Sequence, residues 1–304
     1  MAVSKIWYPS SVVMAKAISY PGHIEKAKAQ INRNLKAVDV VFELIDSRIP
    51  YSGRAYEWKS LFSNKETVIV LTKRDLADPS VTDQWIHYYR NKGKMALPIS
   101  LLGKPKQIVA DLKKIRDSIP TKRAIRKAMI VGIPNVGKTS LVNAIKKGGK
   151  AAVGNFPGIT RGIQWMIVDD DFMVLDTPGI LYKDLHAPHI TKKLILCGCV
   201  RPAHGWLEES IEYGIQTIAN LYPGEMKATM LTWELATKNE RSFIEQSALE
   251  KGFLSKKGMP DVQRALDYWL KQFSEGGMGR FSLETPKRLF ADPQNESEPT
   301  LGDV

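Results

Sequence analysis

The chain has 304 residues, long enough to bury a real hydrophobic core in one large domain or two modest ones. No apolar run approaches the roughly 18 residues that a membrane-spanning helix needs, and residues 1–22 lack the apolar core of a secretory signal. The net charge of +12 favours polyanionic partners without identifying one. The two cysteines, Cys197 and Cys199, are too few for a four-ligand zinc site, and we expect reduced thiols.

The first segment, residues 1–36, ends in an amphipathic helix that we expect over residues 23–35. A Tyr-Pro pair at positions 8 and 9 recurs at positions 20 and 21, in a short repeat. This repeat leaves both Met1 and Met14 open as the natural first residue.

Short apolar runs alternate with amphipathic stretches in residues 37–189, a pattern that predicts a doubly wound, mostly parallel sheet with helices on both faces. The apolar runs are nearly continuous, as in strands that are buried on both sides. We expect strands at 38–45, 68–71, 95–99, 129–131, 163–168 and 173–175 and helices at 80–92, 105–118 and 138–147.

The pattern changes near residue 190 to apolar stripes with helical spacing. The stronger stripe runs from Val262 to Phe273. We therefore expect a small all-α domain over 190–283. Residues 284–304 are rich in proline and acidic side chains, and we expect a disordered tail there.

Polar residues follow the carboxyl ends of five predicted strands: Asp46, Thr72 to Asp75, Ser100, Gly132 and Asp176. Open α/β sheets bind their ligands at this edge. The sequence therefore predicts one ligand site built from five loops.

The segment Gly132–Thr139 fits the phosphate-loop pattern GxxxxGKS/T, between a predicted strand and a predicted helix. In this motif, glycines let backbone amides curl around phosphate, a lysine neutralises the β- and γ-oxygens, and the last hydroxyl binds magnesium. The following helix directs its positive end at the phosphates. The expected nucleotide-binding residues of this segment are Asn135, Val136, Gly137, Lys138, Thr139 and Ser140.

The segment Asp176-Thr-Pro-Gly179 follows the next such strand. An aspartate there can hold a magnesium-bound water, and the Gly179 amide can meet the γ-phosphate. Thr160 lies between the two motifs and is the candidate switch residue that contacts magnesium when the γ-phosphate is present. The expected magnesium ligands are thus Thr139, Thr160 and, through water, Asp176.

The segment Thr72-Lys73-Arg74-Asp75 predicts guanine recognition. The Asp75 carboxylate can accept from guanine N1–H and the 2-amino group, a donor pair that adenine lacks. The Lys73 stem can lie over the base plane, and Ser100 would close its other side. Thr72 stands where asparagine is usual, which removes an amide able to bond the base and to tie this loop to the phosphate loop. We expect weaker binding with specificity retained.

The order of the motifs is circularly permuted, because the base motif and Ser100 precede the phosphate loop, Thr160 and Asp176. The same sheet forms when the old termini are joined and the chain is opened elsewhere. The opening falls just after Gly179, so the loop that senses the γ-phosphate runs into the helical domain. We expect nucleotide state to set the position of that domain.

The chain resembles the YlqF/RbgA family of circularly permuted ribosome-assembly GTPases over most of residues 19–283. The resemblance rests on Tyr20-Pro-Gly-His23, Asp46-Ser-Arg48-Ile-Pro50, the permuted motif order, Gly132-Ile-Pro-Asn-Val-Gly-Lys, Pro157-Gly-Ile-Thr160 and Asp176-Thr-Pro-Gly-Ile-Leu. It implies a GTPase that uses GTP and GDP with magnesium and acts late in maturation of the large ribosomal subunit, binding its RNA. Thr72 and the residues before Ser19 depart from the family pattern.

Hydrolysis needs an unusual group, because Ile180 occupies the position where many GTPases place a water-orienting glutamine. The resemblance suggests His23, whose neutral imidazole can orient a water or accept a proton. A structural or RNA-contacting role for His23 stays open. Asn135 resembles the asparagine with which some GTPases hold potassium near the phosphates.

Two functional hypotheses remain at this level. One is an enzyme whose slow hydrolysis of GTP is stimulated by the large ribosomal subunit. The other is a GTP-dependent binding module for another RNA, such as the small subunit or tRNA, in which hydrolysis only times release. We expect a cytoplasmic monomer without membrane or DNA partners. The candidate RNA contacts are Lys251, Lys256, Lys257, Arg264 and Lys271.

Overall fold

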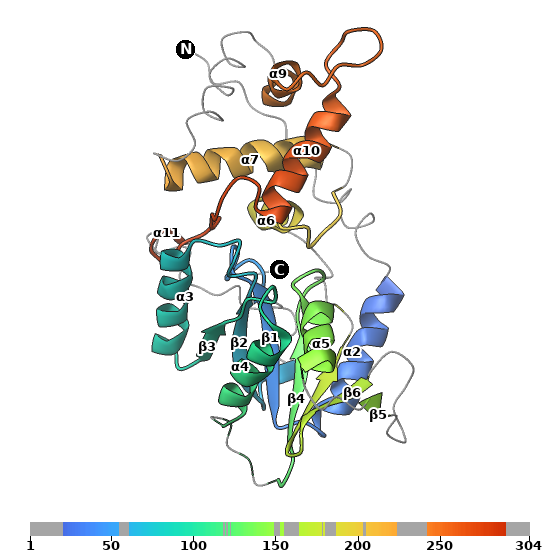
Figure 1. Cartoon of the computed structure of the whole chain (residues 1–304), viewed down its shortest axis with the longest axis vertical. Helices are drawn as coiled ribbons and strands as arrows, with labels where there is room; N and C mark the ends of the chain where they lie inside the picture. Colours follow the sequence, from blue (N-terminus) through green and yellow to red (C-terminus); the bar gives the residue numbers. More distant parts are fainter. Residues whose placement is uncertain are drawn as a thin grey trace.

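The computed structural model describes residues 21–54, 61–117, 119, 121, 123–148, 153–154, 164–177, 179, 187–202, 205–223 and 242–289. A sheet flanked by helices forms one part of the molecule, and helices that follow residue 187 gather beyond one edge of that sheet (Figure 1). This arrangement confirms the predicted class, an α/β domain followed by a helical part.

The described strands form one seven-stranded sheet in the order β3-β2-β1-β4-β7-β6-β5. Five of them run parallel, from β3 to β7 in that order. Their bounds are β1 Val40–Asp46, β2 Glu66–Thr72, β3 Met95–Pro98, β4 Arg126–Val131, β5 Val153–Gly154, β6 Gln164–Asp169 and β7 Phe172–Asp176.

The strand β6 runs antiparallel to β7, and β5 pairs antiparallel with β6. The reason is local: only Asp170 and Asp171 separate β6 from β7, and so short a connection permits only a hairpin. The sequence pattern indicated β6 but not its direction, and it did not indicate the two-residue strand β5.

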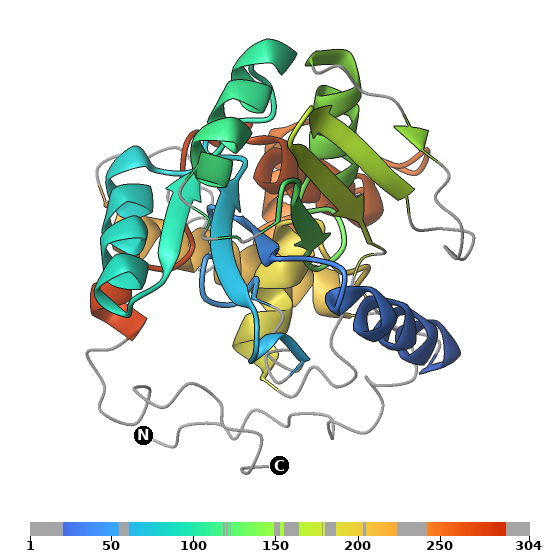
Figure 2. The ribbon, with the colours of Figure 1, turned by 90° about the horizontal axis from the view of Figure 1, so that it is seen from below.

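Helices cover both faces of the sheet, as predicted. On one face, α4 (Pro105–Asp117) and α5 (Lys138–Gly148) bury Leu112 and Leu141 in the same hydrophobic core as Phe42 of β1. On the other face lie α2 (Pro21–Leu35) and α3 (Pro79–Asn91). Successive residues of β1 alternate between the two cores, as pleating requires. Figure 2 shows α4 and α5 on one side of the strands and α2 on the other.

The helical part consists of α6 (Pro188–Leu196), α7 (Trp206–Leu221), α9 (Phe243–Glu250) and α10 (Val262–Glu275). The predicted stripe of α10 is buried through Ala265, Trp269 and Phe273. At Gly214 of α7, an added Cβ would lie 2.6 Å from the Phe273 ring and 2.7 Å from Leu196. These three helices therefore meet at a point where any larger residue would force the Phe273 or Leu196 side chain to shift.

Two expected boundaries need correction. The boundary between residues 189 and 190 falls inside α6, whose first turn begins at Pro188. The expected tail is ordered at its start: Glu284 is 3% exposed and α11 (Pro286–Leu289) packs on α3. Buried hydrogen bonds to Glu284, described below, explain this order. Residues 1–20 and 290–304 lie outside the described residues. Within the described parts of the chain, no helix is long and apolar enough to cross a membrane.

Candidate functional site

The parallel strands place the predicted motif residues at one edge of the sheet. The register pairs Asp46 with Thr72 at the carboxyl ends of β1 and β2, and Ser100 follows β3. The neighbouring strands β4 and β7 end just before Gly132 and at Asp176. The structure thus brings the base motif, Ser100, the phosphate loop and Asp176 to a common edge.

The phosphate loop connects β4 to α5, which begins at Lys138. Gly132 passes close to β1, where an added Cβ would lie 2.6 Å from the Leu44 carbonyl oxygen. Gly137 has φ +98°, and a Cβ there would lie 2.6 Å from Leu101. Both glycines are therefore required by backbone geometry. The side chains of Thr139 and Ser140 at the start of α5 are exposed, so their hydroxyls are accessible.

The Lys138 ammonium lies inside the loop, where it donates to the carbonyls of Gly132 (3.0 Å) and Ile133 (2.8 Å). Its residue is 8% exposed. Burial lowers the pKa of Lys138 to about 8, although Asp176 acts in the opposite direction. A Cβ on Gly179 would lie 3.2 Å from Lys138 Nζ. The two motifs expected to meet the γ-phosphate are therefore adjacent.

Asp176, at the end of β7, has a buried Oδ1 with no hydrogen-bond partner among the described residues. Burial raises the pKa of Asp176, with Lys138 opposing the rise. A buried carboxylate oxygen without a partner is costly. This atom therefore fits a role as acceptor for a water or ion that nucleotide binding brings in.

Thr72 corrects one expectation. Its hydroxyl lies 2.7 Å from the Val136 carbonyl oxygen and 3.1 Å from that of Ile45, and the residue is fully buried. The base motif is thus tied to the phosphate loop through threonine, so the predicted loss of that tie was wrong. Threonine retains a donor in place of the amide, directed at a backbone carbonyl.

Asp75 and Ser100 lie together, since the Ser100 hydroxyl donates to Asp75 Oδ1 at 2.9 Å. Lys73 has φ +53°, and its ammonium lies 3.0 Å from Asp46 Oδ2. Burial lowers the pKa of Lys73, but the Asp46 carboxylate outweighs that effect and the net pKa is raised. Lys73 is therefore charged and held by an ion pair.

Asp46 was expected at the binding edge without a specific contact, and Arg48 was quoted only as part of the family motif. Arg48 donates from its backbone N and its Nε to Asp46 Oδ1, both at 3.0 Å, and from Nη2 to Oδ2 at 2.8 Å. Burial alone would raise the pKa of Asp46, but Arg48 and Lys73 hold that pKa well below its usual range. The sequence signal for this ion pair was a carboxylate at the end of an apolar strand, followed two residues later by an arginine.

Asn135 has φ +60° and donates from Nδ2 to the Gly198 carbonyl at 2.6 Å, in the turn after α6. The phosphate loop therefore contacts the helical part directly. Thr160 and Ile180 lie outside the described residues, as does the side chain of His23, whose backbone belongs to α2.

Comparison with known proteins supports the same interpretation. Residues 127–206 match the model of a family described as "50S ribosome-binding GTPase". The chain is 34% identical over 278 residues to Ribosome biogenesis GTPase A of Thermotoga maritima, an alignment that covers 91% of this chain and 98% of that protein. It is 35% identical over 196 residues to Mitochondrial ribosome-associated GTPase 1 of Mus musculus, with 60% of each chain covered.

A solved structure of GNP-bound YlqF from T. maritima is also similar. It has a TM-score of 0.63 and 29% identity, and the match covers 86% of this chain and 99% of that one. The sequence identity, the nearly complete coverage of the relative and the permuted order of the motifs agree, and the chain belongs to the ribosome biogenesis GTPase A (YlqF/RbgA) family of circularly permuted GTPases.

Proposed function

We propose that this chain is a guanine-nucleotide switch that hydrolyses GTP and acts in assembly of the large ribosomal subunit. The observation that carries the proposal is the hydrogen-bonded pair of Asp75 and Ser100, which lies at the same sheet edge as the phosphate loop. The same edge of the sheet then offers a carboxylate to bind the base of a nucleotide and a loop to bind its two or three phosphates.

The base is selected by Asp75, whose carboxylate accepts from N1–H and the 2-amino group of guanine. Ser100 fixes this carboxylate through Oδ1. The Lys73 stem would lie over the base plane. Adenine offers no such donor pair, so ATP leaves the Asp75 charge unpaired. An Asp75→Asn variant should lose its preference for GTP over ATP while it keeps its fold.

The phosphates bind at the loop amides and the amino end of α5. The expected contacts are Asn135, Val136, Gly137, Lys138, Thr139 and Ser140. On nucleotide binding, the Lys138 ammonium would give up its hydrogen bonds to the two loop carbonyls and donate to phosphate oxygens instead. The negative charge of the phosphates favours the protonated form of Lys138.

The residues near Asp176 fit a magnesium ion. Asp176 Oδ1 is a buried oxygen without a partner among the described residues, and the Thr139 hydroxyl is accessible. Hard oxygen donors of this kind suit magnesium, which keeps several waters. Thr139 and Thr160 would hold it directly and Asp176 through water. When bound, it neutralises charge on the β- and γ-phosphate oxygens.

Hydrolysis relies on His23 in this proposal, since Ile180 offers no polar atom to a water. A His23→Ala variant that retains full subunit-stimulated turnover would remove His23 from the mechanism. Potassium at Asn135 is tested separately, by comparing turnover in potassium and sodium salts. Equal rates would exclude a specific potassium site.

Nucleotide state should also change the helical part, because α6 follows Gly179 closely in the chain. The hydrogen bond from Asn135 to Gly198 supports this coupling, as it joins the phosphate loop to the turn after α6. Proteolysis of residues 190–275 should differ between GDP and a non-hydrolysable GTP analogue. Equal protection would argue against coupling through the γ-phosphate.

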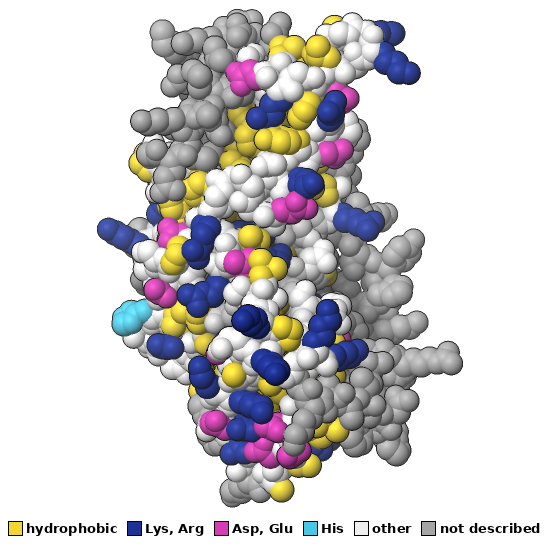
Figure 3. Space-filling view, viewed as in Figure 1, with side chains coloured by type: hydrophobic (Ala, Val, Ile, Leu, Met, Phe, Trp, Pro, Cys, Tyr) yellow, Lys and Arg dark blue, Asp and Glu magenta, His cyan; other side chains and the backbone are white. Residues whose placement is uncertain are grey.

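The surface around the α9–α10 connection suits RNA. Lys251 lies 4.8 Å from the ring of Tyr268, and Arg264 lies 4.5 Å from the ring of Phe253. Lys256 and Lys257 are exposed on the connection itself. Basic side chains interleaved with aromatic rings favour phosphate and base contacts. Figure 3 shows Lys and Arg side chains spread over the whole face in view, with Asp and Glu side chains among them.

The deciding experiment measures phosphate release from GTP, and from ATP as a control, with and without purified large ribosomal subunits. We expect slow GTP hydrolysis that rises many-fold with large subunits. The Asp75→Asn variant is the control for guanine dependence. Stimulation by small subunits or tRNA instead would favour a GTP-dependent module for another RNA. No preference for GTP over ATP would overturn the switch itself.

A further inference from the structure

A segment that follows α10 returns to the nucleotide-binding part of the molecule. This segment, residues 276–284, is called the strap here. Its residues Phe281 to Glu284 are all buried. The backbone N of Leu283 donates to the Arg48 carbonyl at 2.9 Å. The Glu284 carboxylate accepts from the backbone N atoms of Tyr51 (3.2 Å) and Ser52 (3.0 Å). The strap is therefore firmly docked on the loop after β1.

The strap also holds the loop that contains Asp75. Arg280 donates from Nη2 to the Arg74 carbonyl at 3.0 Å and from Nε to the Ala77 carbonyl at 3.2 Å. These carbonyls lie on either side of Asp75 in the chain. Gly276 has φ +80° and passes against Leu76, where an added Cβ would lie 2.8 Å from Leu76 Cδ2. One guanidinium thus bridges the backbone around the base-reading carboxylate.

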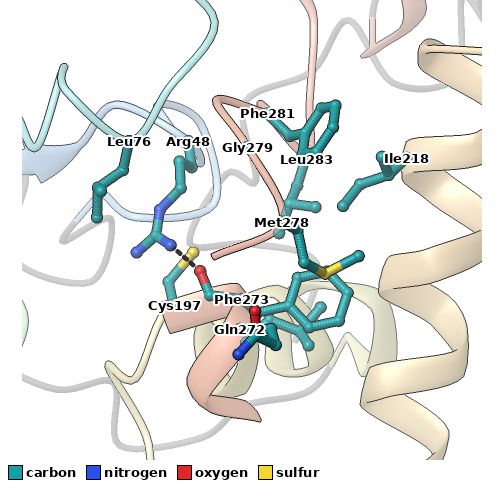
Figure 4. A pocket seen from close by; sticks show the side chains of 11 residues that line it. Arg48, Leu76, Cys197, Ile218, Gln272, Phe273, Met278, Gly279, Phe281 and Leu283 are labelled. Atoms are coloured by element: carbon teal, nitrogen blue, oxygen red, sulfur yellow. Dashed lines mark hydrogen bonds between the residues drawn. The ribbon is translucent and has the colours of Figure 1, made fainter. Parts of the chain in front are cut away.

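A second connection runs from Lys73 to α10. The Lys73 ammonium pairs with Asp46, and Asp46 pairs with Arg48. Arg48 Nη1 then donates to the carbonyls of Phe273 and Ser274 in the last turn of α10. Figure 4 shows the Arg48 guanidinium directed at the Phe273 carbonyl, beside Leu76 of the same base loop. The base loop is therefore held from the helical part at both of its ends.

We propose that Arg280 is a positioning residue for guanine recognition, which acts by fixing the backbone around Asp75. The inference rests on the proposed function, in which Asp75 reads guanine. A base loop already held in place loses less conformational freedom on binding, so affinity rises. Lys73 and its positive φ show that the loop adopts a conformation that a free chain disfavours.

The proposal has a reciprocal consequence. If the docked strap favours guanine binding, then guanine binding favours the docked strap by the same factor. Because the base is common to GDP and GTP, both nucleotides should have this effect. The strap thus senses occupancy of the site, in contrast to a γ-phosphate switch, which distinguishes GTP from GDP.

The test compares three variants of the full chain: Arg280→Ala, Arg280→Lys and Arg288→Ala. Arg288 is the matched control, an exposed arginine on α11 only eight residues further along the chain. Binding of GDP, a non-hydrolysable GTP analogue and ADP is titrated by fluorescence. We expect Arg280→Ala to weaken binding of both guanine nucleotides roughly fivefold to tenfold, with the loss of a charged hydrogen-bond donor. The GDP-over-ADP preference should shrink by a similar factor.

The conservative variant Arg280→Lys distinguishes a positioning role of Arg280 from a non-specific loss of structure. Arg280→Lys keeps the charge and one donor group, so it should recover part of the affinity, and Arg288→Ala should match the unsubstituted protein. Urea unfolding without nucleotide confirms that each variant is folded. Hydrogen exchange at the Leu283 amide should slow equally with GDP and with the GTP analogue.

Two failures are distinguishable. If the unsubstituted chain binds ADP as well as GDP, the proposed guanine function is wrong, whatever Arg280 does. If that chain prefers GDP but Arg280→Ala binds like Arg288→Ala, only the positioning role is overturned. Exchange at Leu283 that does not respond to GDP would also contradict the coupling.

Discussion

The Thr72 hydroxyl lies 2.7 Å from the Val136 carbonyl oxygen, and this hydrogen bond joins the end of β2 to the phosphate loop. Both residues are fully buried. A single side chain thereby fixes the distance between the loop that reads the base and the loop that holds the phosphates. A nucleotide contacts both loops at once, so its affinity depends on that distance being set beforehand.

Replacing Thr72 with valine tests this connection. Valine keeps the branched shape but leaves the buried Val136 carbonyl without its donor, which should cost about 1–3 kcal/mol of unfolding free energy. GDP should bind several-fold more weakly, while Thr72→Ser should recover both quantities. Thr67→Val is the control: among the described residues, the Thr67 hydroxyl makes only a long contact of 3.4 Å, with the carbonyl of Lys65 just before β2. Urea unfolding and fluorescence titration give the values, and equal results for the two valine variants would contradict the role.

Asp46→Asn should destabilise the chain by about 3 kcal/mol at neutral pH, because Arg48 and Lys73 lose the carboxylate that neutralises both of them. Asp111→Asn, at an exposed pair with Lys114, should cost less than about 1 kcal/mol. Urea unfolding of each variant is the measurement.

The pH dependence of the Asp46 effect has a definite sign. The folded-state pKa of Asp46 lies well below its usual range, so its stabilisation is complete above about pH 4 and is lost as the pH falls through the folded pKa. The stability difference between the parent and Asp46→Asn should therefore shrink below about pH 4, by up to about 1.4 kcal/mol per pH unit. A difference that stays constant down to pH 3 would show that the ion pairs do not hold Asp46 ionised.

The sheet could be predicted from sequence because its signals are local. Apolar runs such as Val68–Leu71 mark buried strands, and polar residues at their carboxyl ends mark the binding edge. The direction of β6 was missed because apolar periodicity is the same in parallel and antiparallel strands. The short connection at Asp170 and Asp171 was the signal for a hairpin.

The residues of the site likewise fall into those that local sequence motifs predict and those that only the fold brings together. The phosphate loop and Asp75 belong to motifs whose spacing encodes their chemistry, so they can be predicted from the sequence. Arg280 could not be identified, because it lies more than two hundred residues from the Arg74 carbonyl that it holds. Neither its residue type nor its neighbours in the chain indicate this role, and Arg280 reaches the base loop only because the strap folds back from α10. Thr72 was identified, but its tie to the phosphate loop was misjudged, since it depends on a buried backbone carbonyl.

Gly214→Ala tests the packing of the helical part. Alanine favours helices by about 1 kcal/mol over glycine, but its Cβ would lie 2.6 Å from the Phe273 ring and 2.7 Å from Leu196. Overpacking should dominate and lower the unfolding free energy by about 1–3 kcal/mol. Gln216→Ala, at an exposed position of α7, should have an effect within about 0.5 kcal/mol. A Gly214→Ala variant as stable as its control would mean that Phe273 and Leu196 move aside freely.

Lys138 should make nucleotide binding depend on pH in the range where lysine is normally always charged. Burial lowers its pKa to about 8 in the nucleotide-free protein, while bound phosphates favour the ammonium form, so binding takes up a proton. GDP affinity should fall about fourfold between pH 7 and pH 8.5, the ratio of the protonated fractions for a pKa of 8. Calorimetry at pH 8 in two buffers with different ionisation enthalpies measures the uptake directly. In Lys138→Arg the guanidinium stays charged over this pH range. This variant should therefore take up fewer protons on binding GDP, and its GDP affinity should fall less between pH 7 and pH 8.5. If the parent chain and this variant take up the same number of protons at pH 8, the Lys138 ammonium is fully charged before the nucleotide arrives.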